Sequence, residues 1–287
     1  MQRTWRLAPV IVATIFATGM IAAPAAFSPG AYAAEQEYAP QVGQEGKDVI
    51  WVPTPQSLVE RMLDMAKLTA KDIHYDLGSG DGRTVIAAAK RGAQAVGVEY
   101  NPDMVALSER AAEKEGVSGK ARFIHGDIFQ TDFSHATVLT LYLLPSLNVK
   151  LRPTILSMKP GTRVVSHAFT MDDWEPDQTD SADGRTAYLW IVPARVDGTW
   201  RTASGEIVLK QKYQKLSGTL KSGNGAASIS GGKLNGVQIR FNANGVRYSG
   251  RVNGDRIEGT AQASAGGTTK WSATRVPPPT AAQKSGA

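Results

Sequence analysis

A glycine-rich stretch at residues 75–83, Tyr-Asp-Leu-Gly-Ser-Gly-Asp-Gly-Arg, limits the folds open to this chain more than any other feature. It joins an apolar, strand-like run to a helix-like run. Closely spaced glycines let the backbone turn sharply and approach a ligand, and the first N–H groups of the following helix can bind that ligand. The stretch therefore predicts an α/β fold with a pocket at the carboxyl end of the first strand.

The glycine spacing and three acidic residues distinguish this turn from a dinucleotide-binding turn. The glycines follow the spacing G-x-G-x-G instead of G-x-G-x-x-G. Asp76 precedes the first glycine by two residues, Glu99 ends the next predicted strand, and Asp127 follows the strand after that. Carboxylates at these points suit an ammonium group, ribose hydroxyls and an adenine amino group, whereas Asp76 would repel a pyrophosphate. The set predicts an amino-acid-bearing nucleoside as ligand and disfavours a nicotinamide oxidoreductase.

Helical and strand-like segments alternate between residues 51 and 193, which is typical of a parallel sheet flanked by helices. Helices are predicted over residues 56–68, through 85–89, and over 102–114 and 147–156. Strands are predicted over residues 73–77, 95–99, 121–124, 137–141 and 163–167. Asn101 and Pro102 suit the N-cap and first turn of the third helix.

The pattern changes after residue 193. Short alternating stretches separated by Gly, Asn and Ser run to residue 274, and residues 232–239 repeat as 250–257. Each repeat contains an Asn-Gly pair, which predicts a type I′ turn. We expect a small all-β domain, a meander or barrel or a sandwich, of about six to eight strands.

The first 34 residues have the features of a secretion signal. Arg3 and Arg6 precede an apolar stretch at residues 10–23, and Ala-Tyr-Ala follows at residues 31–33. We predict an exported protein, periplasmic or envelope-associated. An anchor left uncleaved in the inner membrane is an alternative, because residues 7–26 are about long enough to span a bilayer. An organelle presequence is a third interpretation.

Charge is distributed unevenly along the chain. Residues 35–194 carry 16 basic and 22 acidic side chains, or −6, and residues 195–287 carry 14 basic and 4 acidic, or +10. The basic C-terminal part is either an ordinary solvated face or a surface for an anionic envelope, and no nucleic-acid motif accompanies it. The chain has no cysteine, which excludes disulfides, and its histidines lack metal-ligand spacing, so no metal site is predicted.

The predicted organisation has five parts. They are a signal peptide at 1–34, a linker at 35–50, an α/β domain at 51–194, a basic β-domain at 195–276 and a disordered tail at 277–287.

Residues 45–194 resemble the class I S-adenosylmethionine-dependent methyltransferases, in which a Rossmann-like sheet presents the glycine turn and the three acids in this order. Further stretches are similar to the mitochondrial protein-lysine methyltransferases that act on the ATP synthase c-subunit and adenine nucleotide translocase, and more distantly to the non-SET histone lysine methyltransferases. These stretches are residues 52–55, 97–102, 141–145 and 160–167.

The resemblance implies S-adenosylmethionine as cofactor and a set of residues that bind it. Those residues are Thr54, Asp76, Gly78, Ser79, Gly80, Glu99, Tyr100, Asn101, Asp127 and Ile128. Tyr142 and His167 are implied candidates for positioning the acceptor amine, although packing would explain both equally well. The segment 142–145 lacks the acceptor motifs of the histone and nucleic-acid enzymes.

A protein lysine, in a membrane or envelope protein, is the acceptor that the resemblance favours. Two alternatives stay open: a small-molecule methyltransferase, and a non-catalytic nucleoside-binding envelope protein that acts through its β-domain.

Overall fold

The computed structural model describes residues 38–277, apart from 224 and 265. The predicted signal peptide and nearly all of the predicted C-terminal tail lie outside the described residues. Among the residues that are described, no helix is long and apolar enough to cross a membrane.

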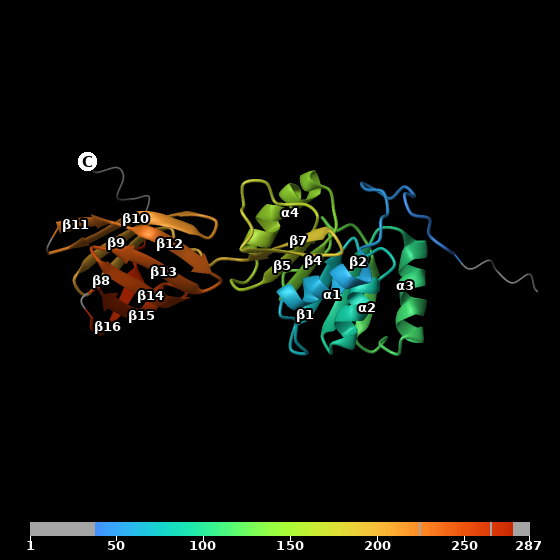
Figure 1. The fold of residues 1–287 in the computed structure, drawn as a ribbon, viewed down its shortest axis with the longest axis horizontal. Helices are drawn as coiled ribbons and strands as arrows, with labels where there is room; N and C mark the ends of the chain where they lie inside the picture. Colours follow the sequence, from blue (N-terminus) through green and yellow to red (C-terminus); the bar gives the residue numbers. More distant parts are fainter. Residues whose placement is uncertain (1–37, 224, 265, 278–287) are drawn as a thin grey trace, which may run out of the picture. The chain divides into compact units, whose positions relative to one another are not determined.

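A seven-stranded sheet forms the centre of the first domain, in the order β3-β2-β1-β4-β5-β7-β6 (Figure 1). Neighbouring strands are parallel from β3 to β5, and β7 pairs antiparallel with both β5 and β6. The strands are β1 Ile73–Leu77, β2 Gln94–Glu99, β3 Ala121–His125, β4 Val138–Leu141, β5 Arg163–His167, β6 Gln178–Ala182 and β7 Arg185–Ile191. This Rossmann-like arrangement confirms the predicted α/β class.

Helices pack on this sheet through apolar faces. They are α1 Gln56–Met65, α2 Arg83–Lys90, α3 Pro102–Lys114 and α4 Pro145–Ser157. The side chain of Asn101 accepts a hydrogen bond of 2.9 Å from the backbone N–H of Asp103, so α3 begins as predicted. The first helix ends three residues earlier than expected, and Lys67 just beyond it has a φ of 49°, outside the helical region.

The hairpin of β6 and β7 was missed in the sequence. Asp183 and Gly184 connect the two strands and have φ values of 49° and 71°. Positive φ at both central residues is the requirement of a type I′ turn, for which Asp-Gly is a favoured pair. The Asp-Gly pair is therefore a sequence signal for this hairpin. It was not recognised because the residues of β6 are polar and do not show the apolar alternation of a strand.

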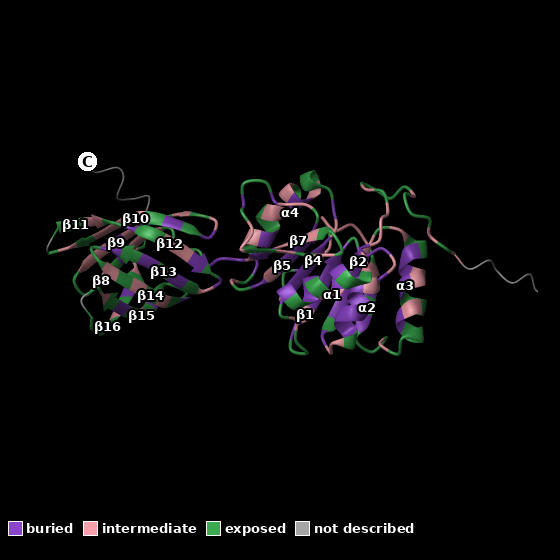
Figure 2. Cartoon of the chain, viewed as in Figure 1, coloured by how far each residue is buried: buried purple, intermediate pink, exposed green. Residues whose placement is uncertain are grey.

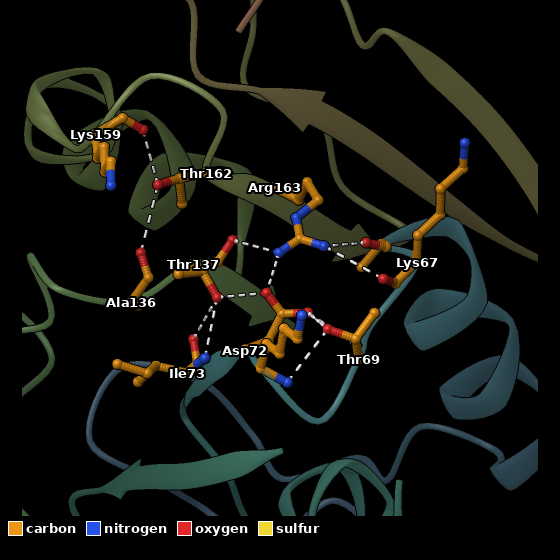
Figure 3. A network of polar contacts seen from close by, with 11 residues as sticks. Lys67, Thr69, Asp72, Ile73, Ala136, Thr137, Lys159, Thr162 and Arg163 are labelled. Carbon is orange, nitrogen blue, oxygen red and sulfur yellow. Dashed lines mark hydrogen bonds and ion pairs between the residues drawn. The ribbon is translucent and has the colours of Figure 1, made fainter. Parts of the chain in front are cut away.

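A polar network joins β1, β4 and β5 at their amino ends (Figure 3). Arg163 forms an ion pair with Asp72, and Thr137 donates to the same carboxylate at 2.7 Å. Burial opposes ionisation of Asp72, but the hydrogen bonds from Arg163 and Thr137 outweigh it and lower its pKa. These contacts tie three strands together at one end.

The second domain is a closed antiparallel barrel of eight strands, within the range predicted. Pairing of the first strand, β8, with the last, β16, closes it, and the short β11 pairs only with β10 and leads directly into β12. The strands are β8 Gly198–Thr202, β9 Gly205–Lys212, β10 Lys215–Ser222, β11 Gly225–Ser228, β12 Ser230–Asn235, β13 Gln238–Ala243, β14 Val246–Asn253, β15 Arg256–Ala263 and β16 Thr268–Arg275. Side chains alternate between the apolar interior and the exposed outer face, most clearly along β13 (Figure 2).

The turns of the internal repeat differ from the type I′ turns predicted. Asn235 and Asn253 are the last residues of their strands, and Gly236 and Gly254 open the turns with φ values of 57° and 56°. A type I′ turn needs positive φ at both central residues, and here only the first has it, so these turns are not of type I′. The Asn-Gly pair that does occupy both central positions is Asn244-Gly245, with φ values of 49° and 70°.

Candidate active site

A pocket of about 300 Å³ lies at the carboxyl ends of β1, β2 and β4. Parallel strands bring these ends to one edge of the sheet, so residues far apart in sequence meet there. All ten residues predicted to bind the cofactor line the pocket, and so does Tyr142. His167 is not among the lining residues.

Asp76 provides a buried carboxylate at the end of β1. Asp76 is 6% exposed, and its carboxylate accepts a hydrogen bond of 2.6 Å from the Thr140 hydroxyl. Burial raises the pKa of Asp76 to about 7, against hydrogen bonds from Thr140 and Thr84 that act in the opposite direction. A bound ammonium group would supply the positive charge that this carboxylate lacks.

Behind Asp76, a buried histidine completes a hydrogen-bonded chain. His74 Nε2 lies 2.8 Å from the Thr140 hydroxyl oxygen. Because that hydroxyl gives its proton to Asp76, His74 must be the donor to it, which fixes the Nε2–H tautomer. Burial lowers the pKa of His74 to about 3, so the imidazole is neutral and adds no charge beside Asp76.

The glycine turn forms a close-fitting cradle. Gly78, Gly80 and Gly82 have φ values of 78°, 54° and 78°, in the region that favours glycine. A Cβ on Gly80 would lie 2.7 Å from the indole nitrogen of Trp51. The Ser79 hydroxyl is buried against Gly97 of β2, so this turn also packs closely on the neighbouring strand.

Glu99 is held rigidly at the end of β2. One carboxylate oxygen accepts from Gly80 N–H at 2.9 Å, and the other accepts from the N–H groups of Tyr100 and Asn101 at 2.9 and 3.0 Å. A carboxylate offers about four acceptor positions, so one is left for a hydroxyl group. The same side chain thus fixes the glycine turn and faces the pocket.

Asp127 is already engaged by a residue that the sequence did not single out. It accepts from Phe129 N–H at 2.8 Å and pairs with Lys47 Nζ at 2.5 Å. The hydrogen bonds from Lys47 and Phe129 lower the pKa of Asp127. Lys47 Nζ also lies 4.8 Å from the centre of the Tyr100 ring. No local pattern could reveal this pair, because the two residues are 80 positions apart.

The rings of Tyr142 and His167 are in contact in a tilted arrangement, with ring centres 3.8 Å apart and an interplanar angle of 30°. His167 is fully buried, and its Nδ1 lies 3.0 Å from the Thr54 hydroxyl. Burial, with a smaller contribution from Arg185, lowers the pKa of His167 to about 4, so the ring is neutral at pH 7. The structure therefore places Tyr142 at the pocket wall and His167 behind it.

The described part of the predicted linker, residues 38–50, is folded against the pocket. Its backbone forms a hairpin in which Gly43 N–H donates to Trp51 O and Trp51 N–H donates to Gln44 O, both at 2.9 Å. We call residues 41–54 the arm. Arg83 fixes the end of the arm by donating to the Thr54 carbonyl at 3.0 Å.

These residues fit S-adenosylmethionine. Asp76 and the glycine turn would hold its ammonium end, Glu99 its ribose, and Asp127 its adenine amino group. Two observations support this fit: the buried Asp76 carboxylate, for which the described residues supply no cationic partner, and the glycine backbone that lines the pocket beside it. When bound, the cofactor supplies an electrophilic methyl group carried on a sulfonium.

The Rossmann-like sheet with this pocket defines a class I S-adenosylmethionine-dependent methyltransferase. A family model described as the ANTKMT methyltransferase domain matches residues 76–178. The chain belongs to this family.

Individual relatives agree with this assignment. A protein-lysine N-methyltransferase of Saccharolobus islandicus is 44% identical over 151 residues, which are 50% of this chain and 94% of that protein. The ATP synthase c-subunit lysine N-methyltransferase of Rattus norvegicus is 35% identical over 145 residues, covering 50% of this chain and 67% of that protein.

Among solved structures, one described as an RNA methyltransferase from Salinibacter ruber in complex with S-adenosyl-L-homocysteine is 49% identical. It covers 50% of this chain and 96% of that chain, with a TM-score of 0.49.

Proposed function

We propose that this protein methylates the side-chain amine of a lysine in a protein acceptor. The observation that carries the proposal is the 44% identity to a protein-lysine N-methyltransferase, almost all of whose length this chain covers. A second relative, 35% identical, is named for a lysine of the ATP synthase c-subunit.

The charge of the pocket supports a cationic acceptor. Six acidic and two basic side chains line it: Glu45, Asp48, Asp76, Asp81, Glu99 and Asp127 against Lys47 and Arg83. Such an excess of carboxylates raises the local concentration of an approaching lysine. Three exposed apolar side chains, Ile50, Tyr100 and Leu144, also line the pocket, so an acceptor lysine flanked by apolar residues would find complementary contacts.

The chain's own residues would align the acceptor and keep water away. The Tyr142 ring, backed by His167, forms a firm wall beside the glycine turn. The neutral His167 adds no positive charge that would repel the lysine. The acceptor must lose a proton before it can react, and solvent at the open side of the pocket can receive it. Alignment and desolvation supply most of the rate in such a reaction.

The test uses the full chain and S-adenosylmethionine with a deuterated methyl group. Extracts from cells that lack the gene provide three acceptor pools: proteins, dialysed small molecules and RNA. Mass spectrometry should find the label on lysine in a protein. Label confined to small molecules or to RNA would overturn the proposal.

Two variants make this test specific. Asp76→Asn should abolish labelling, because the neutral amide cannot pair with the ammonium of the cofactor. Glu113→Gln, which removes an exposed acid from α3, should label as the wild type does. Equal labelling by Asp76→Asn would show that the methyl transfer does not use this pocket.

We further propose that the barrel binds an anionic envelope surface. Arg240, Arg247, Arg251 and Lys270 are exposed on the outer face of β13, β14 and β16. Strand register places Arg240 and Lys270 in one cross-strand row, through Ser249 and Thr260. Among the described residues none of these four cations forms an ion pair, and the nearby Glu258 is paired with Arg256.

Vesicles containing phosphatidylglycerol or only phosphatidylcholine test this surface. Each cation near an anionic membrane contributes about 1 kcal/mol, so changing Arg240, Arg247 and Arg251 together to Gln should weaken binding to anionic vesicles up to about a hundredfold. A triple change of Lys71, Lys114 and Lys159 to Gln is the charge-matched control. Equal loss in both variants, or a preference for RNA over vesicles, would contradict the proposal.

Export through residues 1–34 stays a prediction and forms part of this proposal. A reporter enzyme that folds only outside the cytoplasm, fused after residue 287, should be active if the chain is exported.

A further inference from the structure

The base of the arm and its tip are held by different kinds of contact. Near Thr54 the arm is anchored by two contacts: the buried hydroxyl of that residue lies 3.0 Å from His167 Nδ1, and its carbonyl accepts a partly buried hydrogen bond from Arg83. Trp51 lies against the glycine turn. The hairpin then extends toward its tip, where Gly46 N–H donates to the Val49 carbonyl at 2.9 Å.

At the tip, Lys47 makes the contacts that the cofactor's adenine is expected to make. Its ammonium group pairs with the Asp127 carboxylate at 2.5 Å and lies 4.8 Å from the centre of the Tyr100 ring. Asp127 is the carboxylate expected to meet the adenine amino group, and Tyr100 is one of the predicted cofactor-binding residues that line the same pocket.

We propose that Lys47 is an internal ligand of the adenine site, which the incoming cofactor must displace. The inference rests on the methyltransferase function and goes beyond it, because it makes the arm a competitor of the cofactor. Displacement would free the tip of the arm while its base stays anchored beside the glycine turn.

The ion pair between Lys47 and Asp127 is weak enough for the cofactor to displace it. The Lys47 side chain is 35% exposed, and that of Asp127 is 15% exposed. Ion pairs that solvent reaches are weak, and they are weakened further by salt. The contact therefore lowers cofactor affinity about two- to fivefold and is given up when the nucleoside binds.

The experiment measures the affinity of S-adenosylhomocysteine by calorimetry for the wild type, Lys47→Met, Lys47→Arg and Lys71→Met. This ligand lacks the sulfonium charge, so a gain cannot be attributed to weaker repulsion of a cation. Lys47→Met should bind it about two- to fivefold more tightly. Lys47→Arg should show no gain, and neither should Lys71→Met, which removes an exposed charge outside the pocket.

Adenosine is the second probe, because it lacks the amino-acid end. It should gain by the same factor in Lys47→Met, since the competition concerns the adenine end alone. Lysine acetylation followed by mass spectrometry is an independent readout: S-adenosylhomocysteine should increase the reactivity of Lys47 relative to Lys71.

Weaker binding by Lys47→Met, or protection of Lys47 by the ligand, would show that the lysine grips the bound nucleoside and would overturn the proposal. Unchanged affinity would overturn it as well. Failure of the wild type to bind S-adenosylhomocysteine would instead refute the cofactor site itself, so the two failures are distinguishable.

Discussion

The ionisation of Asp76 should set the pH dependence of cofactor binding. The carboxylate is buried and its pKa is raised to about 7. Pairing with the ammonium group of the cofactor requires the ionised form. With a pKa of about 7, the ionised fraction falls from about nine-tenths at pH 8 to about one-tenth at pH 6, which costs about 1.4 kcal/mol of binding free energy. Affinity should therefore fall about tenfold between pH 8 and pH 6.

The assay is calorimetric titration with S-adenosylhomocysteine at pH 8, 7 and 6, repeated in two buffers to count the protons released. Proton release should be close to one at pH 6 and near zero at pH 8, since Asp76 must ionise as the ligand binds. Asp76→Asn should bind weakly at every pH and lose the pH dependence. Glu113→Gln should retain the wild-type profile.

The same shift has a consequence for the free protein. An aspartate in the unfolded chain ionises near pH 4, so the protonated, folded form is favoured below that value. The stability contributed by the raised pKa is lost as pH rises from about 4 through about 7. If the affinity for S-adenosylhomocysteine is instead constant from pH 8 to pH 6, the pKa assigned to Asp76 and both consequences drawn from it are wrong.

Three further changes have defined outcomes. Thr140→Val removes the hydroxyl that donates to Asp76 at 2.6 Å, so the midpoint of the pH profile for S-adenosylhomocysteine binding should move upward. Asp72→Asn leaves the partly buried Arg163 without its counter-ion and should lower the free energy of unfolding in urea by about 2–4 kcal/mol at pH 7, with a smaller difference from the wild type below pH 4. Gly97→Ala would place a Cβ 2.5 Å from the Ser79 hydroxyl, so it should lower the melting temperature and weaken cofactor binding in calorimetry; wild-type values would contradict the close packing.

Local sequence was sufficient for the elements that begin and end by local rules. The bounds of β1, α3 and β5 agree with the predicted ranges, because each has a clear apolar run or a cap such as Asn101. The three acids could be placed in one pocket from the sequence alone, since parallel strands must end at the same edge of the sheet.

The conformation of the hairpin turns in the barrel could not be predicted as well from the sequence. A glycine tolerates positive φ in several turn types, so the Asn-Gly pairs of the repeat did not determine which residues occupy the centre of the turn. Strand register, which depends on the side chains that face the barrel interior, decided it.

What the sequence by itself determined is the chemistry of the cofactor site: a glycine turn and three carboxylates at successive strand ends. Only the tertiary structure brought Lys47 to Asp127, placed His167 behind Tyr142, and closed the barrel by pairing β8 with β16. The physical reason is range. Glycine conformation, capping and strand periodicity act over a few residues, whereas these contacts join segments whose separation along the chain is bridged only when the whole fold has packed.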